Sequence, residues 1–393
     1  MISRTMKESL RSSSLIRKMF EEGNRLKKIY GAENVYDFSI GNPDLEPPQT
    51  VIDAFRQISF AAEPGIHKYM PNAGYLSTRE AVSNSLCTGE VRPGPECIVM
   101  TAGAAGAINV ALKALLDPGD EVLVITPYFV EYFAYIRNHG GIPKIVGCHE
   151  QTYEIDLDSL RQNVTDKTKA VIINSPNNPS GAVYSEDLLR RLNALLRSFD
   201  HTIYVISDEP YREIVFDGVE VPSTMDLLED LILCYSWSKA LALPGDRIGY
   251  LAVSPRAEDR EDLIAACILA NRSLGFVNAP AVMQRVIEKS INSRADIGSY
   301  RRRRDLLYDV VVDSGYTCFK PKGALYLFPV SPVSDDKAFT DIAAKHNLLV
   351  VPGSAFGMPG HFRITFCVDE NTISNSRRAF KDSFTEAARS GQE

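Results

Sequence analysis

The sequence predicts an α/β fold in which a mostly parallel central sheet carries helices on both faces, beside a smaller α+β domain. From about Cys97 to Tyr250, short apolar runs alternate with turn-rich and helical patterns. Strands that alternate with helices in this way form largely parallel sheets covered on both sides. Beyond about residue 285 the alternation fades, and a long helical pattern is followed by strand-like runs. This change of pattern predicts the second, smaller domain.

The smaller domain is expected to draw on both ends of the chain. A chain of 393 residues exceeds the usual size of one domain. We predict that residues 49–285 form the large domain, while residues 1–48 and 286–393 form the N-terminal and C-terminal parts of the small one.

The N-terminal part begins with a predicted helix over 15–30, where apolar residues recur at near-helical spacing until Gly31. Alternating residues over 35–40 predict a strand, which ends at the turn-forming stretch 41–44. A second helix is predicted over 50–58.

Apolar runs of strand length mark the predicted sheet of the large domain, at 97–100, 122–125, 170–173, 203–206, 231–235 and 248–253. Helical patterns lie between several of them, including an Ala/Leu-rich one that ends at Leu116 and another over 185–198. In the C-terminal part a long helical pattern runs to about Asp313, and residues 323–328 and 362–366 have the pattern of strands.

Composition argues against a nucleic-acid-binding protein. Charged residues make up 24% of the chain and the formal net charge is −7. Apart from Arg301–Arg304 there is no basic block of the kind that binds nucleic acid. That run lies in a helical pattern, which predicts a solvated face or a set of ion pairs.

Neither disulfides, nor a metal site, nor a membrane span is expected. The seven cysteines are scattered without a close Cys-x-x-Cys pair, which argues against disulfide or zinc-binding pairs and favours a reducing compartment. No apolar stretch approaches the ~18 residues of a membrane span. Residues 1–30 are rich in Ser, Lys, Arg and Glu and lack the apolar segment of a secretory signal. We therefore expect a cytoplasmic protein.

Residues with chemical function follow the predicted strands of the sheet. Gly103, Phe129, Asn178, Asp208 and Lys239 each come a few residues after an apolar run. Ligands of parallel sheets bind in the crevice beyond the carboxyl ends of the strands. The sequence therefore predicts that these residues meet at one edge of one sheet.

The stretch Ser236-Trp237-Ser238-Lys239, together with Arg247, predicts a cofactor site. A lysine at the end of a buried strand lies half out of the core, where its amine can act as a nucleophile. Hydroxyl groups and an arginine near it can bind an anion of phosphate size. An amine that forms a Schiff base beside an anion site indicates pyridoxal phosphate above other cofactors. The alternative for this stretch alone is a solvent-facing lysine and arginine on a loop.

Asp208 and Arg363 fit the same interpretation, although each has an ordinary structural alternative. A carboxylate at the end of a buried strand raises the pKa of a nearby basic nitrogen, here the pyridine nitrogen of the cofactor. The alternative is an aspartate that caps the next helix. Arg363 lies on the face of its predicted strand opposite Phe362, and it can hold a carboxylate with two parallel hydrogen bonds. The alternative is an exposed arginine on an edge strand.

Weaker signals lie near these two residues. Tyr211, three residues after Asp208, can donate a hydrogen bond to the phenolate oxygen of the cofactor, and so can Asn178 in a turn-rich segment. The alternatives are a core tyrosine and a plain loop. Gly103 opens a helix whose free N–H groups can hold a phosphate, although most Gly-Ala turns only pack closely.

In their order along the chain, these residues resemble the pyridoxal-phosphate-dependent aminotransferases of class I and II, in the aspartate aminotransferase-like superfamily of fold type I. The resemblance extends from about Tyr36 to Phe366. Its landmarks are Ser39-Ile40-Gly41-Asn42-Pro43-Asp44, His67-Lys68-Tyr69, Gly74-Tyr75, Thr101-Ala102-Gly103-Ala104, Asn177-Asn178-Pro179-Ser180-Gly181, Asp208-Glu209-Pro210-Tyr211, Ser236-Trp237-Ser238-Lys239, Gly245-Asp246-Arg247-Ile248-Gly249 and Phe362-Arg363-Ile364.

The resemblance implies a role for each of these residues. Lys239 would form the Schiff base and move the proton, Asp208 would pair with the pyridinium, and Phe129 would stack on the ring. Tyr211 and Asn178 would bond the phenolate oxygen, while Arg363 would clamp the α-carboxylate of the substrate with help from Asn178 and Gly41. The phosphate would be held by the helix start at Gly103, Ala104 and Ala105, by Ser236, Ser238 and Arg247, and by Tyr69 of a second subunit, which implies a homodimer with active sites at its interface.

Departures from the family pattern affect specificity more than chemistry. Ala105 stands where many relatives have a polar phosphate-binding side chain, and Ser180 replaces a commoner threonine. Leu269 occupies the place of the arginine that dicarboxylate-specific members of one subgroup use, and Arg272 is displaced from it. Aspartate specificity therefore does not follow. The side-chain pocket is expected to involve loops near 12–20 and 270–278.

The implied reaction is transfer of an amino group from an L-amino acid to a 2-oxo acid by a ping-pong cycle. A pyridoxal-phosphate-dependent carbon–sulfur β-lyase is the alternative, because the same fixed residues tune the cofactor without choosing the bond that breaks. A non-enzymatic cofactor-sensing module is a third possibility, but the roughly 35 residues before the fold leave no room for the DNA-binding domain that such relatives carry.

Overall fold

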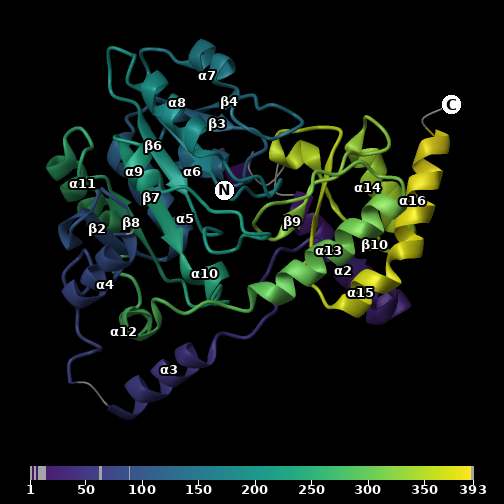
Figure 1. Cartoon of the computed structure of the whole chain (residues 1–393), viewed down its shortest axis with the longest axis horizontal. Coiled ribbons are helices and arrows are strands. Elements are labelled where there is room, and N and C mark those ends of the chain that lie inside the picture. The colour runs from purple at the N-terminus through teal and green to yellow at the C-terminus, as the bar shows by residue number, and fades with distance from the viewer. Residues whose placement is uncertain (1, 4–5, 8–14, 62–63, 88, 391–393) are drawn as a thin grey trace.

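A computed structural model gives the structure of the chain and describes residues 2–3, 6–7, 15–61, 64–87 and 89–390. It confirms the α/β class, with a seven-stranded, mostly parallel central sheet (Figure 1). The strand order is β2-β8-β7-β6-β5-β3-β4. The strands are β2 (Ile98–Thr101), β3 (Glu121–Ile125), β4 (Ile142–Val146), β5 (Thr168–Asn174), β6 (Tyr204–Asp208), β7 (Leu231–Ser236) and β8 (Gly249–Val253).

Two features of this sheet were not predicted. Strand β4 pairs in parallel with β3 at the edge of the sheet, where Ile142 and Ile145 are exposed. Because an edge strand is covered less completely, its residues Ile-Pro-Lys-Ile-Val lack the uninterrupted apolar run of a central strand. Strand β8 is antiparallel to both its neighbours, β7 and β2, a direction that an apolar run does not encode.

Helices cover both faces of the sheet because alternate strand residues point to opposite sides. Within β5, Val171 and Ile173 join one apolar core, while Ala170 and Ile172 join the other. The first core includes residues of α3 (Gln49–Ala61), α4 (Leu76–Leu86), α8 (Glu186–Leu196), α9 (Thr224–Leu227) and α12 (Ala281–Ser290), and the second those of α5 (Gly103–Leu115), α6 (Tyr132–Asn138) and α11 (Arg260–Ser273). The short helices α7 (Leu157–Asn163) and α10 (Trp237–Ala240) complete this part.

The remaining elements combine both ends of the chain. Strand β1 (Tyr36–Asp37) pairs in parallel with β10 (Leu348–Leu349), and a three-stranded antiparallel sheet has the order β11-β12-β9. Its strands are β9 (Tyr326–Leu327), β11 (Val351–Pro352) and β12 (Phe362–Thr365), and the helices around them are α2 (Leu15–Tyr30), α13 (Ile297–Asp313), α14 (Asp336–Lys345), α15 (Glu370–Asn375) and α16 (Arg377–Ser390) (Figure 1). The domain limits at residues 48 and 285 stay a prediction.

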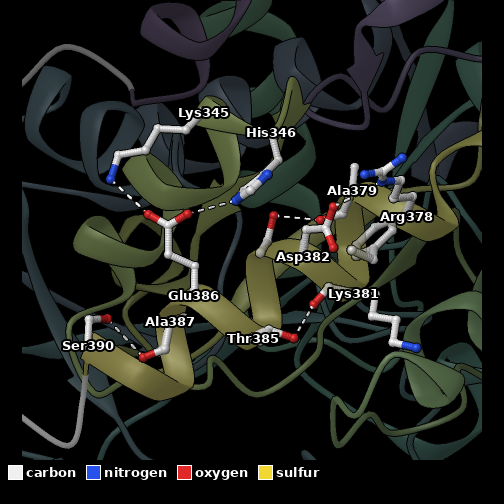
Figure 2. Close-up of polar contacts among 12 residues, drawn as sticks. Lys345, His346, Arg378, Ala379, Lys381, Asp382, Thr385, Glu386, Ala387 and Ser390 are labelled. Atoms are coloured by element: carbon white, nitrogen blue, oxygen red, sulfur yellow. Dashed lines mark hydrogen bonds and ion pairs between the residues drawn. The ribbon is translucent and has the colours of Figure 1, made fainter.

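The C-terminal helix α16 is held against α14 by apolar packing and by a small charge cluster. Lys345 Nζ and His346 Nε2 lie 3.0 and 2.8 Å from the two carboxylate oxygens of Glu386 (Figure 2). Lys345 is exposed and the other two side chains are partly exposed, and such surface pairs contribute at most about 1 kcal/mol. The buried side chains of Phe380 and Ala387 therefore provide most of the attachment.

The Arg301–Arg304 run forms ion pairs, which was one of the two predicted alternatives. Arg303 contacts both carboxylate oxygens of Asp44, at 2.8 and 2.7 Å. Arg304 is fully buried and pairs with Asp217 and Asp305. No described helix is both long and apolar enough to cross a membrane.

Candidate active site

A cavity of about 550 Å³ lies where the strand ends of the central sheet meet the smaller sheet. Its walls include every predicted site residue except Gly103 and Tyr69. The predicted residues that line it are Gly41, Ala104, Ala105, Phe129, Asn178, Asp208, Tyr211, Ser236, Ser238, Lys239, Arg247 and Arg363. The residues that were expected to meet beyond the strand ends therefore line one cavity.

Lys239 reaches the cavity from α10, the short helix that follows β7. The Ser236 side chain caps this helix by accepting a hydrogen bond from the Ser238 backbone N–H at 3.1 Å. The Lys239 amine donates to the carbonyl oxygen of Gly41 at 2.8 Å. The lysine is therefore partly buried and held by a neutral acceptor, and its amine forms no ion pair with another described residue.

An anion-binding surface forms beside the lysine at the start of α5. The first N–H groups of a helix have no partner within it, and here they include those of Gly103, Ala104 and Ala105. Gly103 adopts a φ of 77°, and a Cβ at this position would lie 2.9 Å from Arg247 Nη2. Only glycine therefore lets the arginine approach the helix start.

Arg247 has a left-handed backbone conformation with a φ of 54°, which is strained for a residue with a side chain. Its guanidinium donates to the carbonyl oxygens of Pro244 at 3.0 Å and Ala102 at 3.2 Å. The Ser236 and Ser238 hydroxyls, 2.6 Å apart, line the same side of the cavity. Donors from three separate segments thus surround a space that suits a phosphate group.

Asp208 presents a buried carboxylate oxygen without a partner. It is the last residue of β6 and lies opposite Asn174 on β5, so it does not cap a helix. Its Oδ2 accepts a hydrogen bond from Tyr132 Oη at 2.5 Å, whereas Oδ1 is buried and bonds to no other described residue. Burial raises the pKa of this carboxyl from 3.8 to about 7. A protonated ring nitrogen on a ligand would pair with Oδ1.

Arg363 is buried in the middle strand of the smaller sheet, so the alternative of an exposed edge-strand arginine is wrong. Its Nη1 donates to Asn178 Oδ1 at 3.1 Å and its Nη2 to the Ser39 carbonyl at 2.8 Å. Within the described part of the chain its Nε has no acceptor, and no carboxylate pairs with the guanidinium. Burial lowers the pKa of Arg363. A buried cation at a cavity wall suits a substrate carboxylate.

Strand β1, which leads into one wall of the cavity, is shorter than the strand predicted over 35–40 and stops at Asp37. The Phe38 backbone still bonds to Leu349 and Thr365, but two carbonyls farther along accept hydrogen bonds from side chains of the site. The Ser39 carbonyl accepts from Arg363, and the Gly41 carbonyl accepts from Lys239. The segment was predicted as a strand followed by a turn, and it forms one wall of the cavity.

Tyr69 lies away from the cavity of its own chain. Its side chain is 93% exposed and belongs to a separate surface pocket with Phe276. Leu269, also exposed, and Arg272 do not line the cavity either. Of the loops expected to shape the side-chain pocket, residues 12–14 and the side chains of 15–20 lie outside the described residues.

Tyr132 and Tyr326 are site residues that the sequence reasoning missed. Tyr132 comes three residues after Phe129, a helical spacing that could have marked it as a neighbour. Tyr326 lies in a predicted strand, but nothing local shows that it faces Tyr211, whose hydroxyl is 3.0 Å away. Ser180, which replaces the threonine commoner in the family, fits its position: its hydroxyl donates to Asn177 Oδ1 within the same loop at 2.8 Å.

A strand-end amine, a phosphate-sized anion site and a buried carboxylate with a free oxygen are the groups that an enzyme needs to use a phosphorylated ring cofactor on an amine or carboxylate substrate. A family model described as aminotransferase class I and II matches residues 33–380. The chain therefore belongs to the class I and II aminotransferases, whose members use pyridoxal phosphate, and it is a pyridoxal-phosphate-dependent transferase.

Individual relatives agree with this family. A probable aspartate aminotransferase of Methanocaldococcus jannaschii is 32% identical over 362 residues, which cover 88% of this chain and 93% of that protein. The crystal structure of an amino transferase from Eubacterium rectale matches with a TM-score of 0.95 and 39% identity, covering 98% of this chain and 99% of that one. An aspartate aminotransferase from Thermus thermophilus with maleate matches with a TM-score of 0.85 and 26% identity, covering 98% and 99% of the two chains.

Proposed function

We propose that this chain transfers an amino group from an L-amino acid to a 2-oxo acid with pyridoxal phosphate bound in the cavity around Lys239. The observation that carries the proposal is the buried Asp208 Oδ1 without a partner, in the same cavity as the Lys239 amine. A protonated pyridine nitrogen satisfies this oxygen and removes the cost of leaving it unpaired. The residues present therefore fit the cofactor.

The cofactor would be held from four directions. Phe129 would cover one ring face, Asp208 would pair with the ring nitrogen, and Tyr211 and Asn178 would donate to the ring oxygen. The phosphate would be bound by the helix start at Gly103, Ala104 and Ala105 and by the side chains of Ser236, Ser238 and Arg247. When bound, pyridoxal phosphate supplies an aldehyde carbon for covalent linkage and an electron-withdrawing ring that weakens a Cα–H bond.

Lys239 would have two tasks in the cycle. Its amine would attach the cofactor covalently and would be released when a substrate amine takes its place. Once freed, it removes the proton from the substrate Cα and later returns a proton during product formation, as a general acid–base catalyst. Gly41 O accepts a hydrogen bond from Lys239 Nζ at 2.8 Å, which supports a role for the amine between the proposed cofactor and substrate regions.

Arg363 would select substrates that carry an α-carboxylate. Its partnerless Nε and its position beside Asn178 leave a fork for two oxygens. The other cations among the described residues that line the cavity are Lys239 and Arg247, which have the roles given above. A cation for the second carboxylate of aspartate would therefore come from outside this set, although the relatives' names make aspartate a donor to test first.

We also propose a cytoplasmic homodimer with the predicted large domain at 49–285 and small domain at 1–48 and 286–393. Tyr69 is exposed and shares a surface pocket with Phe276, and a second copy of the chain would cover both side chains. In that arrangement Tyr69 would reach the phosphate of the other subunit and complete its anion site.

The proposed function is tested by incubating the cofactor-loaded protein with a panel of L-amino acids and with 2-oxoglutarate, pyruvate or oxaloacetate. We expect new amino acid to form only when both donor and 2-oxo acid are present, with the parallel double-reciprocal lines of a ping-pong cycle. The comparisons do not favour the β-lyase. Release of pyruvate and ammonia from cystathionine, without any 2-oxo acid, would overturn the proposal in favour of that reaction.

Replacement of Arg363 is expected to weaken substrate binding more than it slows the chemical step. Arg363→Leu should lower kcat/KM for the preferred amino donor by about 10²–10³-fold, mainly through KM, because a buried charged partner of the carboxylate is lost. Steady-state kinetics measure this change. Arg363→Lys keeps the charge without the planar fork and should lose less. A fall in kcat with unchanged KM in Arg363→Leu would contradict the role.

A further inference from the structure

Tyr326 touches both halves of the proposed site although its sequence neighbourhood carries no recognised motif. It lies on β9, where it pairs with Thr365 of β12, two residues from Arg363. Its side chain is almost fully buried and forms part of the cavity wall. It therefore belongs to the smaller sheet, but its side chain faces cavity residues such as Tyr211, which come after strands of the central sheet.

The ring of Tyr326 packs face-on against the guanidinium of Arg363. The Arg363 guanidinium carbon lies 4.5 Å from the centroid of the Tyr326 ring and 4.8 Å from that of Phe356. An arginine stacked on an aromatic face keeps its orientation, and its charge is attracted by the ring. The same ring packs against Gly41, where a Cβ would collide with its hydroxyl and its ring carbons.

The hydroxyl of Tyr326 points to the cofactor side. Tyr326 Oη lies 3.0 Å from Tyr211 Oη, and the two rings meet edge to face at 6.0 Å. One of the two hydroxyls donates its hydrogen in this pair. The hydroxyl that accepts keeps its own hydrogen, which can be donated to another acceptor. If Tyr211 donates to a ligand, Tyr326 must donate to Tyr211. A hydroxyl that accepts one hydrogen bond becomes a stronger donor in the next.

We infer that Tyr326 is a positioning residue that serves the cofactor and the substrate carboxylate through two different parts of one side chain. Its hydroxyl strengthens the hydrogen bond that Tyr211 donates to the ring oxygen of the cofactor. Its ring holds Arg363 in the orientation that receives the α-carboxylate. The inference rests on the proposed function, because both partners act as assigned there.

Two variants at this position separate the two contributions. Tyr326→Phe keeps the ring and removes only the hydroxyl. Loss of one hydrogen bond in the chain should move the pH midpoint of the holoenzyme's cofactor absorbance upward by about 0.5 unit, since less negative charge is withdrawn from the ring oxygen. The KM for the preferred amino donor should stay within about twofold of the wild-type value.

Tyr326→Leu removes the ring as well. Loss of the stacked face should raise the KM for the amino donor by about 5–30-fold, as expected for a desolvated cation–π contact. The kcat should fall less than the KM rises. Circular dichroism and retained cofactor absorbance establish that this variant is folded and loaded.

Tyr316→Phe is a matched control, because Tyr316 is as buried as Tyr326 and lies in the same apolar core, where its hydroxyl donates to the Phe380 carbonyl at 3.1 Å. It should change neither the absorbance midpoint nor the KM. A second control uses the Tyr211→Phe background, in which adding Tyr326→Phe should produce no further shift because the hydroxyl acts through Tyr211.

The inference is overturned if Tyr326→Phe has the absorbance midpoint of the wild type, or if it shifts the midpoint equally in the Tyr211→Phe background. An unchanged KM in folded Tyr326→Leu would overturn the part that concerns Arg363. These outcomes differ from failure of the proposed function, in which the wild-type protein itself would show no cofactor absorbance or no amino transfer.

Discussion

Lys239→Ala should lose at least about 10⁴-fold in turnover, because one amine serves both as the covalent attachment and as the base that moves the Cα proton. The cofactor should still bind, since the anion site and Asp208 are unchanged, but it should be removable by dialysis. Single-turnover absorbance measurements with an amino donor report the loss.

Lys144→Ala is a suitable comparison for this variant. Lys144 is a partly exposed lysine on the edge strand β4 that pairs with Glu121 at 2.9 Å, far from the cavity walls. It should keep wild-type turnover. Normal turnover in Lys239→Ala would remove the basis of the proposed function.

Asp208→Asn is expected to lower turnover by about 10²–10³-fold, the usual cost of deleting one preorganised electrostatic partner. An asparagine has nearly the same shape, but it cannot carry the negative charge that keeps the ring nitrogen protonated. Its cofactor absorbance should also lose the wild-type response to pH. Steady-state kinetics and spectral titration measure the two effects.

Asp230→Asn controls for loss of a buried carboxylate. Asp230 is also buried, but it precedes β7 at the opposite end from the cavity, where it accepts from the Glu258 N–H at 2.8 Å. Its replacement should affect stability without a specific loss of turnover per folded molecule. Equal turnover losses in both variants would contradict the assignment of Asp208.

The same residue gives the cofactor-free protein a defined pH dependence. Burial raises the pKa of Asp208 from 3.8 to about 7, so between these values the folded state binds a proton that the unfolded state has released. Stability from this group is complete below about pH 4 and is lost as the pH rises through about 7. Cofactor-free Asp208→Asn should therefore gain Tm relative to wild type as the pH rises from 4 to 8. A constant difference would contradict a buried, titrating Asp208.

The parts of the site that follow strand ends could be predicted from the sequence. Asp208 ends β6, and Lys239 lies in α10, the helix that follows β7 directly. Apolar runs locate the strands, and the geometry of parallel sheets brings their ends together without knowledge of any particular contact. Arg247 and Gly103 could be predicted as well, because a helix start and an arginine are both groups that bind an anion.

Contacts between distant segments could not be predicted in the same way. That Arg363 is buried depends on β11 and β9 flanking β12, and a single strand pattern looks the same at an edge and in the middle. The pairing of Tyr326 with Tyr211 joins a strand of the smaller sheet to the turn after β6, and no local spacing encodes it. Likewise, β4 could not be predicted, because a strand at the edge of a sheet lacks a continuous apolar run. Its residues Ile142 and Ile145 are exposed.

Reduction of the cofactor-loaded protein with borohydride, followed by peptide mass mapping, tests the central claim most directly. Reduction makes the covalent link between a lysine amine and the cofactor permanent. We predict one phosphopyridoxyl mark per chain, on the peptide that contains Lys239, and no mark in Lys239→Ala. A mark on another lysine, or no mark in a wild-type protein saturated with pyridoxal phosphate, would contradict it.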